Sequence, residues 1–583
     1  MSKRSVTFNH NPLLAKGLPV WRPRVVLLAL LCGSIALVAR AAYLQGVNDE
    51  FLQAKGESRY ARVIEIPATR GKITDRHGTV LAASTPVKSI WAIPGDAKLT
   101  PAEARKLASL LDMDVRDLNH RLGREGDFVF LKRQVPPEVA ARVAEMKLAG
   151  IHEQREYRRY YPGAEVMSHL LGFTGVDDHG QEGVELAFDR QLTGKPGSRR
   201  VIKDRRGRIV EDVESIRTPQ EGQDIVLSVD AKIQYLAYAA LQSAMDTYRA
   251  KAGGVVVLDA RSGEVLAMVN APSYNPNNRE SLSGAQLRNR ALTDTFEPGS
   301  VVKPIIAAMA LESGKFRFDT VIDTGNGRMT LANATISDTK PHGRLTVAEV
   351  IQKSSNIGAV RMAMSFEPQQ MWRVYDEVGF GSAVGLGFPG EASGRLRAAS
   401  QWRPIEQATM AYGYGLSTSL MQLARSYLVF ARDGEMIPVT LTRADAPPPA
   451  GRRVFSAQTV RETRAMMEMV TQVGGTAVHG QVPGYRVAGK TGTSHKLEGA
   501  HYTSKYVASF VGLAPVSDPR LVVAVMIDEP SGKQYYGGQV AGPVFARVMG
   551  GALRALSIPP DAPVIPMQVA RGKDDAVAVR GRM

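Results

Sequence analysis

The stretch Phe296-Glu-Pro-Gly-Ser-Val-Val-Lys-Pro304 places a serine, Ser300, three residues before a lysine, Lys303. Residues three apart lie on one face of a helix, with Cβ atoms about 5–6 Å apart, so this hydroxyl and amine form a candidate nucleophile–base pair. A Pro-Gly break precedes the serine, and Pro304 is tolerated in a helix only near its first turn. The stretch therefore predicts a helix that begins close to Ser300, where free N–H groups and the helix dipole favour developing negative charge.

The serine–lysine spacing is not specific on its own. A second match, Ser337-Asp-Thr-Lys340, is followed at once by Pro341-His-Gly343, which predicts a turn rather than a helix. A serine at a helix start is also an ordinary N-cap residue. A catalytic interpretation of Ser300 therefore requires partner residues elsewhere in the chain.

Two later stretches supply candidate partners, Lys353-Ser354-Ser-Asn356 and Gly489-Lys490-Thr-Gly-Thr493. A hydroxyl beside a lysine can relay a proton, and an asparagine amide can hold a peptide bond. A lysine flanked by threonine hydroxyls can hold a carboxylate, and a glycine in a strand lets a substrate backbone lie alongside. A similar serine–asparagine pair, Ser273-Tyr-Asn275, sits between prolines, and turn capping explains it better.

The third stretch also matches a nucleotide-binding pattern. Gly484-Tyr-Arg-Val-Ala-Gly-Lys-Thr491 fits the P-loop at every fixed position, and the apolar run that ends at Asp528-Glu529 resembles a Walker B strand. A P-loop, however, needs a buried strand before its first glycine and a helix that begins at the lysine. Here Pro483 precedes that glycine, and Thr491-Gly-Thr-Ser494 is a poor helix start. The context therefore favours a strand-borne lysine over a nucleotide site.

Composition excludes several other functions. The chain has 583 residues and a formal net charge of +16, with one dense basic run at Arg199–Arg208 that we expect to form a solvated hairpin or arm. The sequence has no element in which basic and aromatic residues cluster, so it does not predict nucleic-acid binding. The positive charge instead favours attraction to acidic polymers or anionic lipids. The single cysteine, Cys32, excludes an intrachain disulfide. Because no paired His/Cys spacing is present, we expect neither a metal nor a cofactor.

The N-terminus predicts a membrane anchor. Residues 1–24 are basic and contain no acid, and residues 25–44 form an apolar run interrupted by Arg40, which can snorkel to the membrane surface. The positive flank predicts a cytoplasmic tail over 1–24 and a chain that continues outside the cytoplasm. A cleaved signal peptide is the alternative, because Ala39-Arg-Ala41 is similar to a cleavage site.

The remaining chain predicts a multidomain protein. Residues 45–220 mix strands, turns and helices, with helical periodicity over 101–147, and indicate a non-catalytic spacer or interaction module. Residues 221–558 begin with a strand, a helix and a hairpin, continue through a helical middle, and end with strands and a last helix. This order predicts an α/β layer architecture with a largely antiparallel sheet. We expect residues 559–583 to be a disordered tail.

The three motifs, in order, resemble those of penicillin-recognising serine acyl-transferases. Over residues 20–557 the chain is similar to a class B penicillin-binding protein, and Tyr412-Gly-Tyr-Gly-Leu-Ser417 favours the division-specific type, often called penicillin-binding protein 3. The resemblance implies an N-terminal transmembrane helix, an elongated α+β pedestal and a transpeptidase domain with a mainly antiparallel five-stranded sheet flanked by helices. The resemblance depends also on the stretches Arg70–Gly78, Gly180–Glu185 and Lys203–Arg208.

The resemblance further implies roles for individual residues. Catalysis would use Ser300, Lys303, Ser354, Asn356 and Lys490, while Thr491, Gly492 and Thr493 would bind substrate. The backbone N–H groups of Ser300 and Thr493 would form the oxyanion hole. An unperturbed lysine titrates near pH 10.4, so we expect burial and the cation of Lys490 to depress the pKa of Lys303.

The implied function is D,D-transpeptidation of peptidoglycan at the division septum, in the periplasm and at the inner membrane. The implied partners are D-Ala-D-Ala donor and diamino-acid acceptor stem peptides, β-lactams, a glycosyltransferase of the SEDS family and other divisome membrane proteins. Two alternatives remain open at this point. One is a D,D-carboxypeptidase or β-lactamase-like hydrolase, and the other is a non-catalytic division scaffold or β-lactam sensor.

Overall fold

The computed structural model describes residues 19, 21–47, 61–126, 128–203, 209–280, 282–331, 333–447, 450–499 and 501–563. Most of the expected cytoplasmic tail, the expected tail beyond residue 563 and residues 204–208 of the basic run lie outside the described residues. The chain divides into two units, one formed by residues 1–68 and 195–220 and the other by residues 69–194 and 221–583. The domain boundaries expected at 220 and 558 remain a prediction.

The first unit contains one long apolar helix, α1 (Trp21–Ala42), followed by a π-helical turn over Tyr43–Val47. Within the described residues it is the one helix long and apolar enough to cross a membrane, and none of its residues is buried against protein. It begins four residues before the expected start, since a proline such as Pro23 is compatible with a first helical turn. Its length and composition fit a single-pass membrane anchor.

The first unit also contains an antiparallel sheet of three strands in the order β1-β6-β7. The strands are β1 (Ala61–Ile66), β6 (Gly197–Lys203) and β7 (Ile209–Arg217). The pairing of β6 with β7 confirms the hairpin expected around the basic run, as far as the described strands show it.

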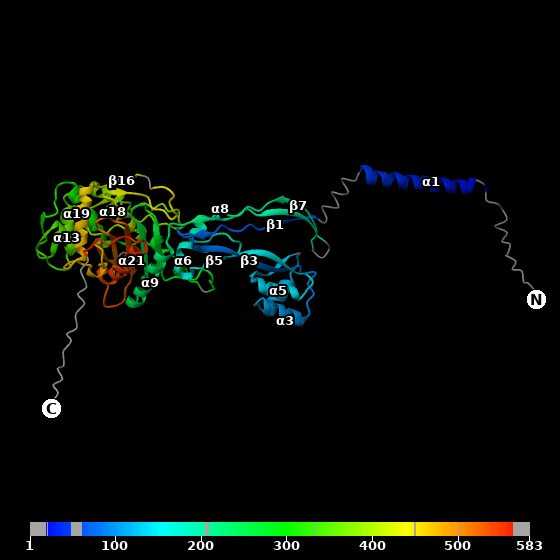
Figure 1. The fold of residues 1–583 in the computed structure, drawn as a ribbon, viewed down its shortest axis with the longest axis horizontal. Helices are drawn as coiled ribbons and strands as arrows, with labels where there is room; N and C mark the ends of the chain where they lie inside the picture. The colour runs from blue at the N-terminus through cyan, green and yellow to red at the C-terminus, as the bar shows by residue number, and fades with distance from the viewer. Residues whose placement is uncertain are drawn as a thin grey trace, which may run out of the picture. The chain divides into compact units, whose positions relative to one another are not determined.

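The second unit opens with a sheet of short and long strands. Its order is β4-β3-β2-β8, and β5 pairs with β3, the long central strand. The strands are β2 (Ile73–Thr74), β3 (Val80–Ala92), β4 (Val129–Val135), β5 (Ile151–Tyr160) and β8 (Ile225–Val226). Six helices accompany them: α3 (Pro101–Leu110), α4 (Val115–Leu122), α5 (Pro137–Glu145), α6 (Ala164–Leu171), α7 (Gly183–Ala187) and α8 (Asp189–Leu192) (Figure 1).

The expectation of continuous helix over 101–147 is wrong in its middle. Strand β4 interrupts it, because its backbone pairs with β3 and its Leu131 and Val135 side chains are buried. The strand expected at the start of residues 221–558 is present but only two residues long, and Asp230 caps the helix that follows it.

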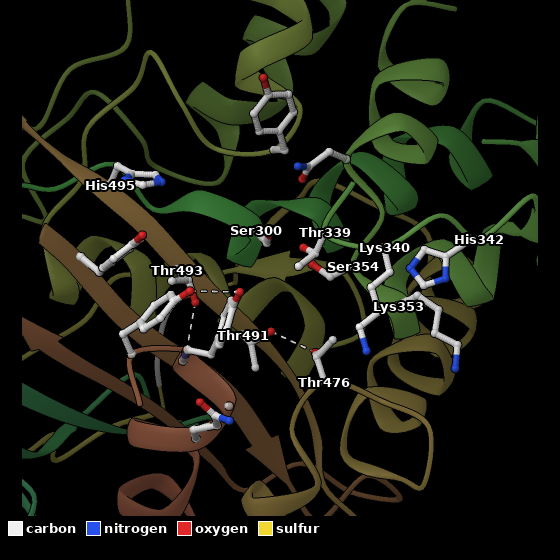
Figure 2. Close-up of a pocket in the computed structure, with 18 of the residues that line it drawn as sticks. Ser300, Thr339, Lys340, His342, Lys353, Ser354, Thr476, Thr491, Thr493 and His495 are labelled. Carbon is white, nitrogen blue, oxygen red and sulfur yellow. Dashed lines mark hydrogen bonds between the residues drawn. The ribbon is translucent and has the colours of Figure 1, made fainter. Parts of the chain in front are cut away.

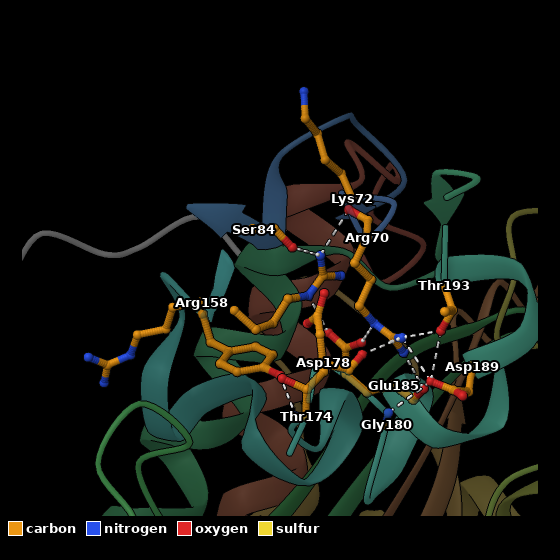
Figure 3. Close-up of polar contacts among 12 residues, drawn as sticks. Arg70, Lys72, Ser84, Arg158, Thr174, Asp178, Gly180, Glu185, Asp189 and Thr193 are labelled. Carbon is orange, nitrogen blue, oxygen red and sulfur yellow. Dashed lines mark hydrogen bonds and ion pairs between the residues drawn. The ribbon is translucent and has the colours of Figure 1, made fainter. Parts of the chain in front are cut away.

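A buried ion-pair network joins the segments of this part of the chain (Figure 3). Glu185 accepts from Arg70 Nε at 2.6 Å and from Arg159 Nε at 2.7 Å, and all three side chains are almost fully buried. Arg70 also donates to Asp189 at 2.8 Å and to Thr193 at 2.7 Å. One buried carboxylate therefore offsets two buried guanidinium groups.

We expect Glu185→Ala to destabilise this unit strongly, by about 3–5 kcal/mol, because two arginines are left buried without their shared carboxylate. The matched control is Asp177→Ala, which removes the partner of Arg133 in an ion pair whose aspartate side chain is 75% exposed. Such a surface pair contributes at most about 1 kcal/mol. Thermal unfolding followed by circular dichroism compares the two variants, and equal midpoints would contradict the role given to Glu185.

The central sheet of the second unit has five strands, all antiparallel, in the order β10-β9-β19-β18-β17. The expected five-stranded antiparallel sheet is therefore confirmed. Its strands are β9 (Ala252–Asp259), β10 (Val265–Ala271), β17 (Ala488–Glu498), β18 (His501–Ala514) and β19 (Leu521–Asp528). Strands β9, β10 and β19 are almost wholly buried, which explains their continuous apolar sequences.

Helices cover both faces of this sheet. A Cβ atom added at Gly253 would meet Leu241 of α9 at 2.8 Å, and one added at the next residue, Gly254, would meet Leu420 of α17 at 3.0 Å. Because successive residues of a strand point to opposite faces, α9 and α17 lie on opposite sides of β9. Helix α21 packs with α9. The bounds are α9 (Ala231–Tyr248), α17 (Leu420–Ser426) and α21 (Gly542–Ala555).

The helical middle of the chain surrounds the nucleophile helix α12 (Lys303–Glu312). Its longer helices are α13 (Val347–Lys353), α14 (Asn356–Ala363), α15 (Pro368–Glu377), α16 (Pro404–Met410) and α19 (Ala457–Thr471). Its short helices are α10 (Gly284–Leu287), α11 (Arg290–Thr293) and α18 (Leu428–Ala431), and a further short helix, α20 (Gly537–Val540), follows β19 and packs on β18 and β17. Its short strands are β11 (Val321–Asp323), β12 (Arg328–Leu331), β13 (Ala334–Ser337), β14 (Arg344–Thr346), β15 (Glu435–Met436) and β16 (Arg452–Arg453).

Candidate active site

The nucleophile turn has the geometry expected from its sequence. A 3-10 turn over Gly299–Val302 leads directly into α12, and Pro304 lies in the first turn of that helix. Gly299 has a φ of +62°, a conformation that glycine adopts without a steric cost. Ser300 therefore stands at a helix start, where backbone N–H groups remain free for a developing negative charge.

The second motif occupies the break between two helices. Helix α13 ends at Lys353, Ser354 takes the left-handed conformation with a φ of +63°, and Ser355 caps α14 through its side chain. A non-glycine residue in this region costs on the order of 1–3 kcal/mol, and such strain is concentrated at functional sites. The break aims Ser354 and Asn356 at the same place.

The second serine–lysine match supports this motif instead of forming a site of its own. Asp338, inside that match, accepts hydrogen bonds from Ser355 Oγ at 2.6 Å and from the backbone N–H groups of Asn356 at 2.5 Å and Ile357 at 3.1 Å. Asn356 Nδ2 donates to the carbonyl oxygen of Ser337 at 2.8 Å. The stretch forms no helix, as predicted, and the carboxylate of Asp338 fixes the start of α14.

The third motif lies on β17, the edge strand of the central sheet beside the nucleophile turn. A Cβ atom at Gly492 would be 2.8 Å from the carbonyl oxygen of Pro298, so only glycine permits this close approach. Lys490 is inside the strand and begins no helix, which confirms that the nucleotide-binding pattern is coincidental. An edge strand also offers unpaired backbone groups to an extended peptide.

Hydrogen bonds connect the three motifs. Lys303 Nζ donates to the carbonyl oxygen of Ser354 at 2.5 Å and to Asn356 Oδ1 at 2.7 Å, and it lies 3.4 Å from Ser354 Oγ. Lys490 Nζ donates to the same Ser354 hydroxyl oxygen at 2.8 Å. All the hydrogen bonds that Lys303 Nζ makes go to the second motif. Ser354 therefore stands between the two lysines.

The two lysines are both fully buried, and burial shifts their protonation. Burial lowers the pKa of Lys303 to about 7, although the carboxylate of Asp338 opposes this shift. Burial, and then repulsion by the charge of Lys303, holds the pKa of Lys490 well below its usual range. The expected cause, burial, is therefore present for Lys303. The repulsion between the two lysine charges, the second expected cause, is mutual and favours the neutral form of one of them.

A cavity of about 740 Å³ opens over these residues (Figure 2). Ser300, Ser354, Asn356, Thr491 and Thr493 all line it, while the two lysines lie beneath its surface. The predicted residues thus converge on one cleft from α12, from the α13–α14 break and from β17.

Sequence reasoning missed several residues of the cleft. Thr476 lines it and shares a hydrogen bond with Thr491 at 3.0 Å. Glu297, which does not line the cleft, accepts from Gly415 N at 2.7 Å and from Tyr502 at 3.2 Å, so it joins the nucleophile turn to two other segments. Further lining residues are aromatic or basic: Tyr412, Tyr414, Tyr506, Tyr535, Tyr536, His342, His495, Lys340 and Lys353. The Tyr-Gly-Tyr-Gly repeat was the one available signal for the tyrosines.

Comparison with known proteins agrees with this geometry. The family model for the penicillin-binding protein transpeptidase domain matches residues 253–550, and the model for the penicillin-binding protein dimerisation domain matches residues 65–227. The chain belongs to the penicillin-binding protein family. The dimerisation-domain match covers most of the region that the sequence indicated as non-catalytic, and the transpeptidase match contains all three motifs.

Curated penicillin-binding relatives cover nearly the whole chain. This protein is 43% identical over 560 residues, 95% of each chain, to the probable peptidoglycan D,D-transpeptidase PenA of Neisseria gonorrhoeae. It is 42% identical over 547 residues, 92% of each chain, to the peptidoglycan D,D-transpeptidase FtsI of Escherichia coli strain K12.

Solved structures of the family show the same fold. The transpeptidase domain of penicillin-binding protein 3 from Burkholderia pseudomallei is 50% identical, with a TM-score of 0.54 over 58% of this chain and 98% of that one. A peptidoglycan synthetase from Bifidobacterium adolescentis is 25% identical, with a TM-score of 0.69 over 86% of this chain and 98% of that one.

Proposed function

We propose that this penicillin-binding protein is the D,D-transpeptidase that cross-links peptidoglycan stem peptides at the division septum. The observation that carries the proposal is the meeting of Ser300, Ser354 and two buried lysines in one cleft, beside an edge strand that can hold a peptide. Relatives that cover more than nine-tenths of the chain are peptidoglycan D,D-transpeptidases by name.

In the acylation step, Ser300 Oγ attacks the carbonyl carbon between the two terminal D-alanines of a donor. A neutral lysine amine has two N–H groups and one lone pair. In Lys303 the two N–H groups are directed to the Ser354 carbonyl and Asn356 Oδ1, so the lone pair is available for the Ser300 proton. The backbone N–H groups of Ser300 and Thr493 stabilise the oxyanion.

The departing D-alanine takes its proton from Ser354, and Lys303, 3.4 Å from Ser354 Oγ, passes the proton that it took from Ser300 to Ser354, so that both groups return to their starting protonation states. Because Lys490 donates to Ser354 Oγ, the Ser354 hydroxyl hydrogen is free to point at the leaving nitrogen. Lys490, Thr491 and Thr493 hold the terminal carboxylate of the donor, and Gly492 lets its backbone approach β17. Asn356 orients the donor amide. The amine of a second stem peptide then attacks the acyl ester, and a β-lactam that mimics the donor leaves a stable acyl-Ser300.

The proposal includes a location and partners. The apolar helix α1 anchors the protein in the inner membrane, and the positive charges before it keep the N-terminus in the cytoplasm and the catalytic domain in the periplasm. The non-catalytic region 45–220 contacts a SEDS-family glycosyltransferase and other divisome membrane proteins. Its size supports this role, since a soluble hydrolase needs no such region.

Product analysis tests the proposal. The purified full-length protein is given a D-Ala-D-Ala donor peptide, alone and with a diamino-acid acceptor, and the products are separated by mass. We expect a cross-linked dimer of donor and acceptor peptides when the acceptor is present, and release of one D-alanine for each cross-link. Hydrolysed donor as the sole product under both conditions would establish a carboxypeptidase. Acylation by penicillin with no turnover of any donor would establish a sensor or scaffold.

A further inference from the structure

Three basic side chains form one side of the active-site cavity. Lys340 and His342 lie in the segment after β13, and Lys353 is the last residue of α13. Figure 2 shows them beyond Ser354 and Thr339, on the side away from Thr493 and His495. We call Lys340, His342 and Lys353 the basic wall.

Acidic side chains do not neutralise the basic wall within the cavity. Among the described residues that line it, none is an aspartate or a glutamate. Asp338, close in sequence, directs its two oxygens to Ser355 and to the start of α14. Glu349, one turn before Lys353, accepts from the N–H and hydroxyl groups of Thr346, and these bonds, with a smaller contribution from the charge of Lys353, lower the pKa of its carboxyl, but Glu349 does not line the cavity. The cavity therefore presents net positive charge on this side.

The basic wall lies on the side of the cavity from which the leaving group departs. Lys353 Nζ donates to the carbonyl oxygen of Gly474 at 2.8 Å, and Gly474 and Thr476 line the cavity next to it. Thr476 in turn shares a hydrogen bond with Thr491, one of the residues that would hold the donor carboxylate. A continuous line of contacts thus runs from the carboxylate grip to the basic wall, on the side where D-alanine departs.

In the second half of the reaction, the acceptor amine enters the cavity where D-alanine left it. D-Alanine leaves as an amine with an adjacent carboxylate, so the acceptor amine must approach the acyl ester along the same path. Its nitrogen forms a bond to the ester carbonyl carbon, the bond from that carbon to Ser300 Oγ breaks, and the proton of the amine returns to Ser300 Oγ through Lys303. The remainder of the acceptor stem peptide then extends outward over the basic wall.

We propose that the basic wall recognises carboxylates of the acceptor stem peptide, so that Lys340, His342 and Lys353 determine specificity for an acidic acceptor. This inference rests on the proposed function. Charge-assisted hydrogen bonds to carboxylates are stronger than neutral ones, and a cleft of one charge sign concentrates ligands of the other. An acceptor whose carboxylates are amidated lacks these contacts and is a poor substrate.

The test compares two acceptors that differ only in charge, a diamino-acid stem peptide with free carboxylates and its amidated form. With a thioester donor, the ratio of transfer to hydrolysis is measured for each acceptor. We expect the wild type to prefer the free acceptor by about tenfold, the factor that about 1.4 kcal/mol supplies. In the double variant Lys340→Gln, Lys353→Gln this preference falls to within about twofold.

Two further variants separate charge recognition from structure. Lys340→Gln, His342→Gln keeps the bond from Lys353 to Gly474 and should also lose most of the preference. Lys232→Gln removes an exposed lysine on α9 that lines a different cavity and should keep the wild-type preference. Equal losses with both acceptors, or an unchanged preference in every variant, would overturn the basic wall as a specificity site.

If the proposed function were wrong, the same experiment would give a different result. Labelling of Ser300 by a fluorescent penicillin is measured on each protein in parallel. A wild-type protein that is labelled but never transfers to either acceptor would overturn the transpeptidase function itself. A wild-type protein that transfers equally well to both acceptors would leave that function intact and overturn only the basic wall.

Discussion

Ser300→Ala is expected to abolish covalent labelling by a fluorescent penicillin, whereas Ser337→Ala is expected to label as the wild type does. The acyl-enzyme requires an oxygen nucleophile, and Ser300 lies in the turn that leads into α12, three residues before Lys303. Loss of a catalytic serine in an acyl-transferring enzyme typically costs about a million-fold in rate. Gel fluorescence after a fixed incubation measures the difference.

The two serines make a matched pair because both precede a lysine by three residues. Ser337 lies at the end of β13 and contributes its backbone carbonyl to Asn356, a contact that alanine preserves. Thermal unfolding of both variants checks that each is folded. Labelled Ser300→Ala together with unlabelled Ser337→Ala would move the nucleophile to the second match and refute the assignment made here.

Much of the fold could be predicted because its strands and helices carry clear local patterns. The apolar runs of β9, β10 and β19 and the strong periodicity of α9 identify elements whose burial the structure confirms. Strand β4 lies between Gly126 and Pro136, but only Leu131 and Val135 of its residues are buried, so it lacks the continuous apolar sequence that marks β9, β10 and β19. The pairing of the strands was even harder to predict, because the paired strands β9 and β19 are separated in sequence by more than half of the catalytic domain.

The site could be predicted only where its chemistry depends on short motifs. Ser300 with Lys303, Ser354 with Asn356, and Lys490 with Thr491 are each local in sequence. Asp338 was overlooked, because its function depends on a contact with a helix start 17 residues later. The aromatic and basic lining of the cleft likewise arises from tertiary packing. Sequence reasoning therefore identified the groups proposed to react and missed those that position them.

Replacement of Lys303 by methionine is expected to slow acylation of Ser300 by about 10²–10⁴-fold, the usual contribution of a general base. Because burial lowers the pKa of Lys303 to about 7, the neutral amine is the major form above neutral pH. The wild-type acylation rate should therefore be fully developed above pH 8 and fall as pH drops through 7, by about tenfold per unit below the pKa. Stopped-flow acylation by a chromogenic β-lactam, from pH 5.5 to 9, measures the profile.

Asp338→Asn distinguishes Lys303 from any other group that titrates near neutrality. The carboxylate of Asp338 favours the protonated form of Lys303, so its removal should lower the pKa of the lysine and move the fall in rate to lower pH. An asparagine oxygen can still accept from Asn356 N and Ile357 N, which preserves the start of α14. The control Asp319→Asn changes an exposed aspartate that lines a separate cavity and should leave the profile in place. A fall that stays near pH 7 or moves to higher pH in Asp338→Asn would show that Lys303 is not the group whose neutral form drives acylation.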